Sequence, residues 1–414
     1  MKKIVYFILL FVLVACENTY EDLHWYSRPY YLTKSYPIRL DASAILTDVQ
    51  VKPPANPDAV FKIVSNDKYV FVGEKMKGIH VFEKTDASHV KPLCFIECKY
   101  MKAFDVANNI LYCNNFVDLL AVDVEDPLRA KVLQRVSGHF NKYSNSSLNM
   151  NNPAANIYEI GYKTIVLTGA ETDTKPAPDF SEYDQLYGNI IVKEIPDSLQ
   201  VDKPYVGFTN VEGSIFTFGN NSLVLCSYNS GMLNIVQSSI SVSGYYGNPK
   251  DLRYKNSILY LFGSIGFVYW DYNNITTPNT TFRNWSNLLD VVSLKEPANS
   301  FVMLYNVTNM QGEFVGFNII SGEITGGNYT ATSFQTLGAT SLVTVNDTIL
   351  ALGNQLALYR FYLKDNIQTI EQIKLYSAIS GACMLKDGNV LIIANKQGLL
   401  FYDISDLGNI KLIP

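Results

Sequence analysis

The chain has 414 residues, with 33 Lys and Arg against 38 Asp and Glu, which gives a net charge of −5 at pH 7. No basic stripe stands out, and this argues against a nucleic-acid partner. The 28 tyrosines and 22 phenylalanines, together with many Val and Ile residues, favour β-strands. The length alone would suggest two domains. A ring of repeats grows by adding units, however, so a chain of this length can form a single domain.

The first 15 residues are predicted to be an export leader. Lys2 and Lys3 precede an apolar run, Ile4–Val14, which has the length of a signal-peptide core and is too short to span a bilayer. The run ends in Leu13-Val14-Ala15-Cys16, which resembles the lipobox of bacterial lipoproteins. That resemblance implies cleavage before Cys16 and acylation of its thiol. The alternative is an ordinary secretory leader in which the Cys has no such role.

Residues 16–52 are predicted to be an acylated tether in front of a folded part, 53–414. Glu17, Glu21 and Asp22 follow the acylation site and are similar to the acidic export tag of Bacteroidetes surface lipoproteins. This similarity implies an outer-membrane lipoprotein exposed at the cell surface, although the sequence leaves open whether it faces the periplasm instead. The stretch 38–51 is capable of forming a strand, so part of the tether could dock on the folded part.

The chain repeats itself. Residues 79–93 superimpose on 119–133 at an offset of 40, and the same phrase closes the chain at 399–413. Each copy contains an apolar strand, an acidic turn, a basic residue and a second apolar strand. A period of about 40 residues with four strands per unit is typical of a β-propeller. We therefore predict an all-β fold, a single closed ring of four-stranded blades.

Eight blades are predicted, with seven as the alternative because the middle units have poorly defined fourth strands. The units are expected to start near residues 59, 102, 155, 213, 249, 290, 338 and 380. Asn, Asp and Gly tolerate the left-handed backbone of tight hairpins and mark the turn between the first two strands of a unit. These turns are predicted at Asn66-Asp67, Asn108-Asn109, Gly161-Tyr162, Asn220-Asn221, Lys255-Asn256, Asn346-Asp347 and Asp387-Gly388.

The acidic turns carry a family resemblance. Strands followed by Asp123-Val-Glu-Asp-Pro127 or Asp403-Ile-Ser-Asp406 resemble the LVIVD repeat, a propeller repeat of bacterial surface proteins. The resemblance is good in units one, two and eight, partial in unit three and weak in units four to seven. It implies a propeller outside the cytoplasm, often lipid-anchored, and brings no catalytic motif. The Asp and Pro residues indicate turn chemistry rather than a calcium loop.

Five cysteines follow Cys16, an odd number without a CxxC pair. We expect them to be buried free thiols, and we expect neither a metal site nor a cofactor. The four histidines do not cluster, and no GxSxG, HExxH or P-loop motif occurs. No catalytic residue is therefore predicted, and the sequence favours a binding protein over an enzyme.

Two long insertions are predicted on one face of the ring, at Ser137–Asn156 and Ala170–Gly188. Long loops on one face of a rigid repeat scaffold are frequent binding sites. Aromatic rings beside amides and cations suit sugar or peptide ligands, because rings stack while amides donate hydrogen bonds. The predicted ligand-binding residues are His139, Phe140, Tyr143, Tyr183, Asp184, Tyr187, Tyr100, Lys102, Tyr228 and Tyr245.

Three functions remain open. The first is a lipid-anchored binding module of the cell envelope for a glycan, a peptide or a partner protein. The second is a polysaccharide hydrolase or lyase, which requires two carboxylates about 5–10 Å apart at the mouth of the channel. The third is a structural subunit of an envelope complex, which requires a broad apolar surface patch.

Cys16→Ser should leave the protein soluble, because the acylated thiol is its predicted anchor. Fractionation of cells into membrane and soluble material measures this. Cys383→Ser is the matched control and should stay with the membrane. Detergent partitioning of Cys16→Ser like that of the parent would refute the assignment.

Overall fold

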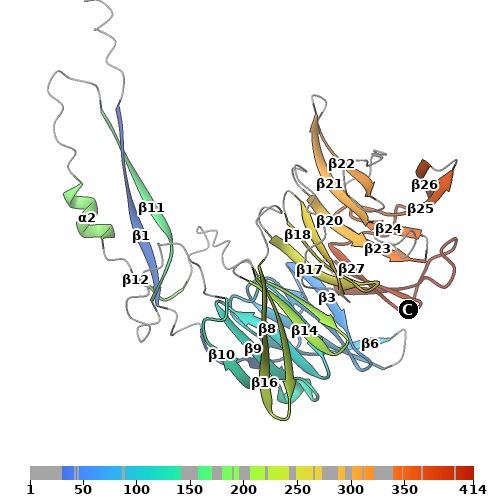
Figure 1. Ribbon diagram of the computed structural model, residues 1–414, viewed down its shortest axis with the longest axis horizontal. Coiled ribbons are helices and arrows are strands. Elements are labelled where there is room, and N and C mark those ends of the chain that lie inside the picture. The colour runs from blue at the N-terminus through green and yellow to red at the C-terminus, as the bar shows by residue number, and fades with distance from the viewer. Residues whose placement is uncertain are drawn as a thin grey trace, which may run out of the picture. The chain divides into compact units, whose positions relative to one another are not determined.

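The chain divides into two compact units (Figure 1). The first unit combines residues 1–44 with 145–201, and the second combines 45–144 with 202–414. A computed structural model describes residues 30–41, 43, 46–85, 89–140, 157–169, 180–188, 191–194, 206–219, 222–241, 249–263, 266–272, 288–293, 301–309, 312–320, 339–346, 348–364, 367–395 and 398–414.

The first unit is a long two-stranded ribbon with a short third strand and a helix. Strands β1 (Tyr30–Asp41) and β11 (Ile157–Gly169) pair antiparallel along their whole length, and β12 (Ile191–Val192) pairs parallel with β1. Helix α2 (Ser181–Tyr187) is tied to β1 through Asp184, which accepts hydrogen bonds from Lys34 Nζ at 2.6 Å and Tyr36 Oη at 2.7 Å. No helix in the described part of the chain is long and apolar enough to cross a membrane.

This ribbon corrects the prediction of a propeller unit starting near residue 155. The predicted turn at Gly161-Tyr162 does not form, and 157–169 is one extended strand. The physical reason is its partner, because β1 satisfies the backbone of β11 from the pair Tyr30 and Gly169 to the pair Asp41 and Ile157. A strand paired along its whole length has no need to fold back on itself.

The described residues of the second unit form seven antiparallel sheets of three to five strands. The first three contain β2 (Gln50–Lys52), β3 (Val60–Ser65), β4 (Tyr69–Glu74), β5 (Gly78–Lys84) and β6 (Val90–Glu97); β7 (Phe104–Ala107), β8 (Ile110–Asn115), β9 (Asp118–Asp123) and β10 (Lys131–Val136); and β13 (Gly207–Val211), β14 (Ser214–Gly219), β15 (Ser222–Asn229) and β16 (Met232–Ser241).

The remaining four sheets follow in chain order. They contain β17 (Pro249–Lys255), β18 (Ile258–Gly263) and β19 (Phe267–Asp271); β20 (Leu288–Ser293), β21 (Phe301–Asn309) and β22 (Gly312–Ile320); β23 (Ser341–Val345), β24 (Thr348–Leu352), β25 (Leu356–Lys364) and β26 (Ile367–Tyr376); and β27 (Cys383–Asp387), β28 (Val390–Asn395), β29 (Gly398–Asp403) and β30 (Lys411–Leu412).

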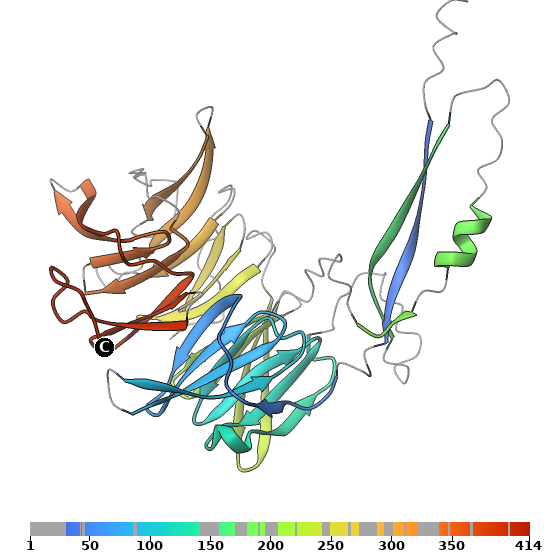
Figure 2. The same ribbon diagram turned by 180° about the vertical axis from the view of Figure 1, so that it is seen from behind.

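The sheets pack face to face in chain order, and the last returns to the first. Strand β3 contacts β7, β7 contacts β13, and β13 contacts β17. The series continues from β18 to β20, β23 and β27, and β27 contacts β3. In Figure 2 the red strands of the last sheet lie beside the blue strands of the first. This is the arrangement of a β-propeller, in which each repeat packs against its two neighbours.

Apolar side chains fill every interface between neighbouring sheets. Trp270, fully buried against Phe216 and Phe218, joins the third and fourth sheets and so packs between blades. The seam between the last and first sheets has its own cluster, in which Val70 and Val72 pack with residues such as Ile392. The predicted buried free thiols are confirmed for Cys94, Cys98, Cys113 and Cys226, whereas Cys383 is a free thiol that is only partly buried.

Turn chemistry located five of the predicted units. The turns near Asn66, Asn108, Asn256, Asn346 and Gly388 join the first two strands of their sheets. Four of these residues have the left-handed backbone that was expected, with φ of 50° at Asn108, 53° at Asn256, 51° at Asn346 and 57° at Gly388.

The unit predicted near residue 213 is displaced by one strand. The Asn220-Asn221 connection follows the second strand, β14, rather than the first. Strand β13 comes before it and turns at Glu212 and Gly213, both with positive φ. A Glu-Gly pair is a weaker hairpin signal than Asn-Asn, so the stronger turn was assigned to the wrong pair of strands.

Both ends of the second unit are held by pairing. Strand β2 pairs antiparallel with β6 as the fifth strand of the first sheet, so a short part of the predicted tether docks there. Strand β30 pairs with β29 and completes the last sheet. Just before and after it, Ile410 is buried and the Ile413 N–H donates to the Phe401 carbonyl at 2.8 Å.

Deleting Asn409–Pro414 should destabilise the protein by about 2–4 kcal/mol, because the buried side chain of Ile410 and the partly buried one of Ile413 return to water. Thermal unfolding should show a melting temperature lower by several degrees. Leu412→Ala is the control, since Leu412 is 55% exposed and should change little. A deletion that melts like the parent would show that the terminus contributes nothing.

Candidate binding channel

The innermost strands of the second unit enclose a cavity of about 940 Å³. Each of the seven described sheets contributes its innermost strand, which we call its first strand, to the lining: β3, β7, β13, β17, β20, β23 and β27. Small-molecule sites commonly have volumes of about 300–1,000 Å³. Because every sheet contributes one strand to the wall, the lining residues come from positions far apart in the sequence.

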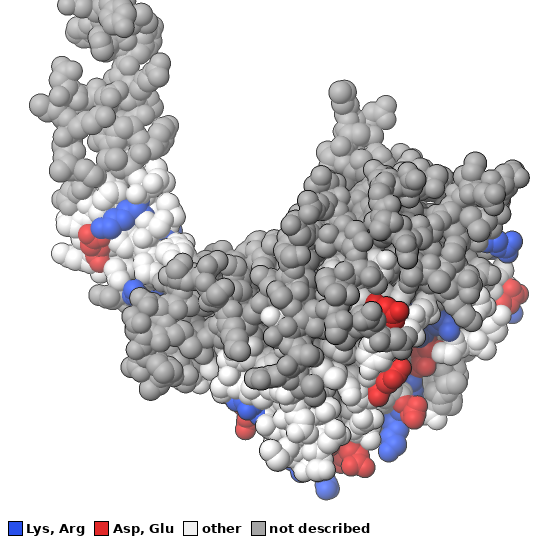
Figure 3. All heavy atoms as spheres, in the orientation of Figure 1, with Lys and Arg blue, Asp and Glu red and all other residues white. Residues whose placement is uncertain are grey.

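Charged side chains interrupt these otherwise apolar strands and loops at the channel wall. On the face of this unit seen in Figure 3, basic and acidic side chains are interspersed. The channel wall is different, because basic residues outnumber acidic ones there. Its cations are Lys62, Lys75, Lys102, Lys250, Arg253, Lys255 and Lys386, and its carboxylates are Asp105, Asp251 and Asp290.

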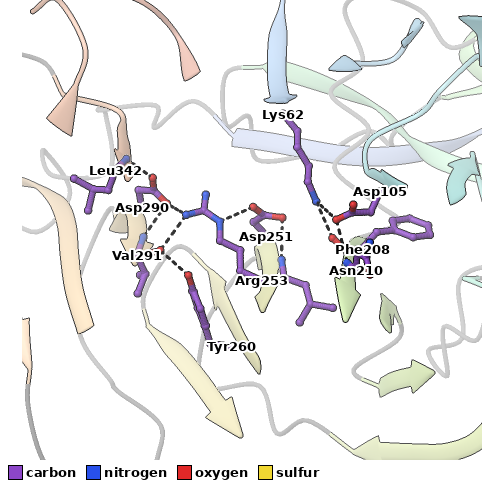
Figure 4. Close-up of polar contacts among 11 residues, drawn as sticks. Lys62, Asp105, Phe208, Asn210, Asp251, Arg253, Tyr260, Asp290, Val291 and Leu342 are labelled. Atoms are coloured by element: carbon purple, nitrogen blue, oxygen red, sulfur yellow. Dashed lines mark hydrogen bonds and ion pairs between the residues drawn. The ribbon is translucent and has the colours of Figure 1, made fainter. Parts of the chain in front are cut away.

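Asp105 ties three neighbouring sheets together (Figure 4). Lys62 Nζ of the first sheet donates to its Oδ2 at 3.1 Å and also to the carbonyl of Phe208 in the third sheet at 2.8 Å. The backbone N–H of Asn210, also in the third sheet, donates to the same Oδ2 at 3.3 Å. The second oxygen accepts the N–H of Val106 at 2.8 Å.

Asp290, in the fifth sheet, likewise connects the fourth and sixth sheets (Figure 4). Arg253 Nη1 lies 2.6 Å from its Oδ1, and the backbone N–H of Leu342 donates to its Oδ2 at 2.6 Å. Arg253 Nε donates in turn to Asp251 Oδ2 at 2.9 Å. Burial raises the pKa of Asp290, whereas Arg253 and the N–H groups of Leu342 and Val291 oppose that rise.

The three channel carboxylates share one local pattern. Each sits in a first strand and accepts the backbone N–H of the next residue, at 2.8–2.9 Å for Asp105, Asp251 and Asp290. Each also accepts from a lysine or arginine. Carboxylates that are held by a backbone N–H and a cation stabilise the channel wall. The hydrolase alternative requires instead a pair of carboxyl groups that face a substrate as acid and base.

The cations at one mouth of the channel, Lys255 and Lys386, have no carboxylate partner among the described residues. Lys255 ends β17, and its Nζ donates to the hydroxyl of Thr344 in β23. Burial, followed by the positive charges of Lys386 and Arg253, lowers the pKa of Lys255 to about 8. Among the described residues, no ion pair joins a carboxylate to Lys255 or Lys386.

Of the described residues that were predicted to bind a ligand, Lys102 alone is part of the channel lining. Phe140 is instead a core residue, 1% exposed, with its ring 5.6 Å from that of Phe208. His139 lies beside it, with Nε2 3.2 Å from the hydroxyl of Thr217. Tyr100 packs near Phe116 with ring centroids 6.5 Å apart.

The other predicted residues are spread over both units. Tyr183, Asp184 and Tyr187 lie on α2 of the first unit, with the two tyrosine rings stacked at 6.4 Å. Tyr228 lies on β15 of the second unit, where its N–H donates to the hydroxyl of Tyr112 at 3.0 Å. The predictions at Cys16, Tyr143 and Tyr245, and parts of both predicted insertions, lie outside the described residues.

Sequence reasoning missed most of the channel residues, although a signal was present. First strands are innermost in a propeller, so a charge within such a strand points to the channel. Lys62, Asp105 and Asp290 interrupt short apolar stretches in this position, whereas Arg253 lies in a strand that is already rich in charge. In the described part of the chain, no group of three or more His, Cys, Asp or Glu residues could hold a metal ion.

No family model matches the sequence, and no curated protein matches it. A chain in the crystal structure of the mitotic checkpoint complex is similar, with a TM-score of 0.52, 12% identity, and coverage of 86% of this chain and 94% of that chain. A candidate 6-phosphogluconolactonase from Bacteroides uniformis gives a TM-score of 0.48 and 10% identity, covering 82% and 87%. The Neurospora crassa Pan2 WD40 domain gives 0.47 and 9%, covering 94% and 96%. At sequence identities this low, the similarity concerns the fold alone.

Asp290→Asn should destabilise the protein by about 3–5 kcal/mol, because it removes a buried charge from Arg253 and turns an amide NH2 toward donors. Chemical denaturation followed by tryptophan fluorescence measures this. Asp406→Asn, at an exposed turn, is the control and should cost about 1 kcal/mol or less. Equal losses in the two variants would contradict the bridging role.

Proposed function

We propose that this protein is a lipid-anchored β-propeller of the bacterial outer membrane, closed as seven blades, that binds a ligand in its central channel. The ligand is a glycan, a peptide or a comparable small molecule. One observation carries the proposal: a cavity of about 940 Å³, bounded by every first strand, presents charged and hydrogen-bonding groups in one place. A concave site with convergent polar groups is the usual form of a small-molecule site.

The channel is a better supported site than the rim loops predicted from the sequence. Phe140 is committed to the core, and His139 lies within hydrogen-bonding distance of Thr217, outside the channel lining. Tyr183 and Tyr187 belong to the first unit, whereas Tyr100 and Tyr228 belong to the second. By contrast, Lys102 and the cations of the first strands lie along one shared wall.

A binding role is better supported than hydrolysis. Each of the three carboxylates at the channel wall is held by a backbone N–H and a cation, and Asp105 and Asp290 also bridge sheets. A general acid or base needs a carboxyl group that can exchange a proton with a substrate. The outer-membrane location rests on the lipobox-like sequence at Cys16 and on the acidic residues that follow it.

A double variant, Thr340→Trp with Ala382→Trp, tests the channel as the binding site. Both residues are exposed, line the cavity and come just before β23 and β27, so two indole rings narrow the channel where these strands begin, without disturbing the core. The full chain with Cys16→Ser supplies soluble protein for glycan and peptide arrays. We expect the double variant to lose at least about tenfold in affinity for whatever the parent binds.

The matched control is Ala55→Trp with Ala59→Trp, two exposed positions outside the cavity lining. This control should bind like the parent and melt at the same temperature. Binding that survives in the channel variant would place the site elsewhere on the molecule. Loss of binding in both variants would also count against the channel, because it would show a general effect of added indole rings.

A further inference from the structure

The channel wall is basic, although the whole chain is acidic. Seven cations and three carboxylates line the cavity, while the chain carries a net charge of −5. An excess of one sign inside a concave, partly desolvated site raises the local concentration of ions of the other sign. The wall therefore favours anions over cations.

The middle of the channel is already neutralised. Lys62 is paired with Asp105, and Arg253 is paired with both Asp251 and Asp290. These groups also accept or donate backbone hydrogen bonds between sheets. A ligand anion at this level would have to displace a structural carboxylate, so the middle is not the favoured place.

The mouth formed by the ends of the first strands has a different composition. Lys255 is the last residue of β17, and Lys386 is the last but one of β27. Thr344, last but one in β23, accepts a hydrogen bond from Lys255 and brings a third sheet to the same mouth. The turn amides of Asn256 and Asn346 also line the cavity here.

These positive charges face one another without a described counter-charge. Lys386 and Arg253 both act on Lys255 as like charges, and the channel carboxylates Asp251 and Asp290 are committed to Arg253. The neighbouring Asp387 is paired with Lys84. Like charges held close in a partly buried site repel by an amount that a bound anion would remove.

We propose that this mouth, between Lys255 and Lys386, binds an oxyanion group of the channel ligand, a phosphate, sulfate or carboxylate. The proposal rests on the channel being the ligand site. Two ammonium groups supply charge and up to five N–H donors beyond the one that Lys255 gives to Thr344, and the Thr344 hydroxyl and the two asparagine amides supply neutral donors. Lysine is a common phosphate ligand that acts as a point charge, so the site selects charge more than shape.

The site should depend on pH in one direction. Lys255 has a pKa lowered to about 8 by burial and by Lys386 and Arg253, and a nearby anion would raise it again. Below about pH 8 the ammonium form is present and attracts the anion. Above that pH Lys255 becomes neutral, so affinity for the anion should fall.

Isothermal titration of the full chain with Cys16→Ser tests this site, using inorganic phosphate, inorganic sulfate and glucuronate at constant ionic strength. We expect at least one of the three to bind, with about tenfold lower affinity in Lys255→Met and in Lys386→Met. Lys131→Met, at an exposed position on an outer strand, is the matched control and should bind like the parent. Parent affinity should also fall between pH 7 and pH 9.5, and Lys255→Met should lose that pH dependence.

Each contrary outcome is decisive. If none of the three anions does more than sodium chloride, or if Lys131→Met loses as much affinity as the other two variants, the oxyanion site is wrong. In that case the tryptophan double variant still decides whether the channel binds a neutral or cationic ligand. If the anions bind but the tryptophan variant retains the array ligand, the anion site stands alone and the channel is not the main ligand site.

Discussion

Packing between neighbouring sheets is the constraint on which the ring depends. A sheet in this unit is apolar on both faces, and each interface has its own cluster of buried side chains, the last of which joins Val70 and Val72 to Ile392 across the seam. No sheet can bury both faces by itself, so stability belongs to the set of neighbours rather than to single repeats. Asp105 and Asp290 add directional polar contacts to this apolar packing. Each binds a cation from the sheet on one side and a backbone N–H from the sheet on the other.

The channel follows from the same arrangement. Because each first strand packs against the next, its inward side chains face a shared cavity, where apolar residues would find no partner. Some charged residues there are paired across sheets, as Lys62 is with Asp105, and these pairs hold the wall together. Lys255 and Lys386 line the cavity without an ion pair to a described carboxylate, and they are the residues that we propose for ligand binding.

The sequence predicted local features well and distant ones poorly. Asn108, Asn256 and Asn346 were recognised because a left-handed turn residue is a local signal. The pairing of β11 with β1 was not, because its partner lies more than 100 residues away and 157–169 looks like any other strand. Phe140 was taken for a loop aromatic because its neighbours in sequence are polar, whereas its contact with Phe208 arises from another sheet. Most of the channel cations were missed because convergence across a ring is invisible until the strands are placed.

A crystal structure of the full chain grown with inorganic phosphate would show whether the channel binds an anion at its Lys255 and Lys386 mouth. We expect tetrahedral density within hydrogen-bonding distance of both ammonium groups, with the bridges at Asp105 and Asp290 unchanged. Phosphate bound only at other surfaces, with this mouth empty, would contradict this expectation.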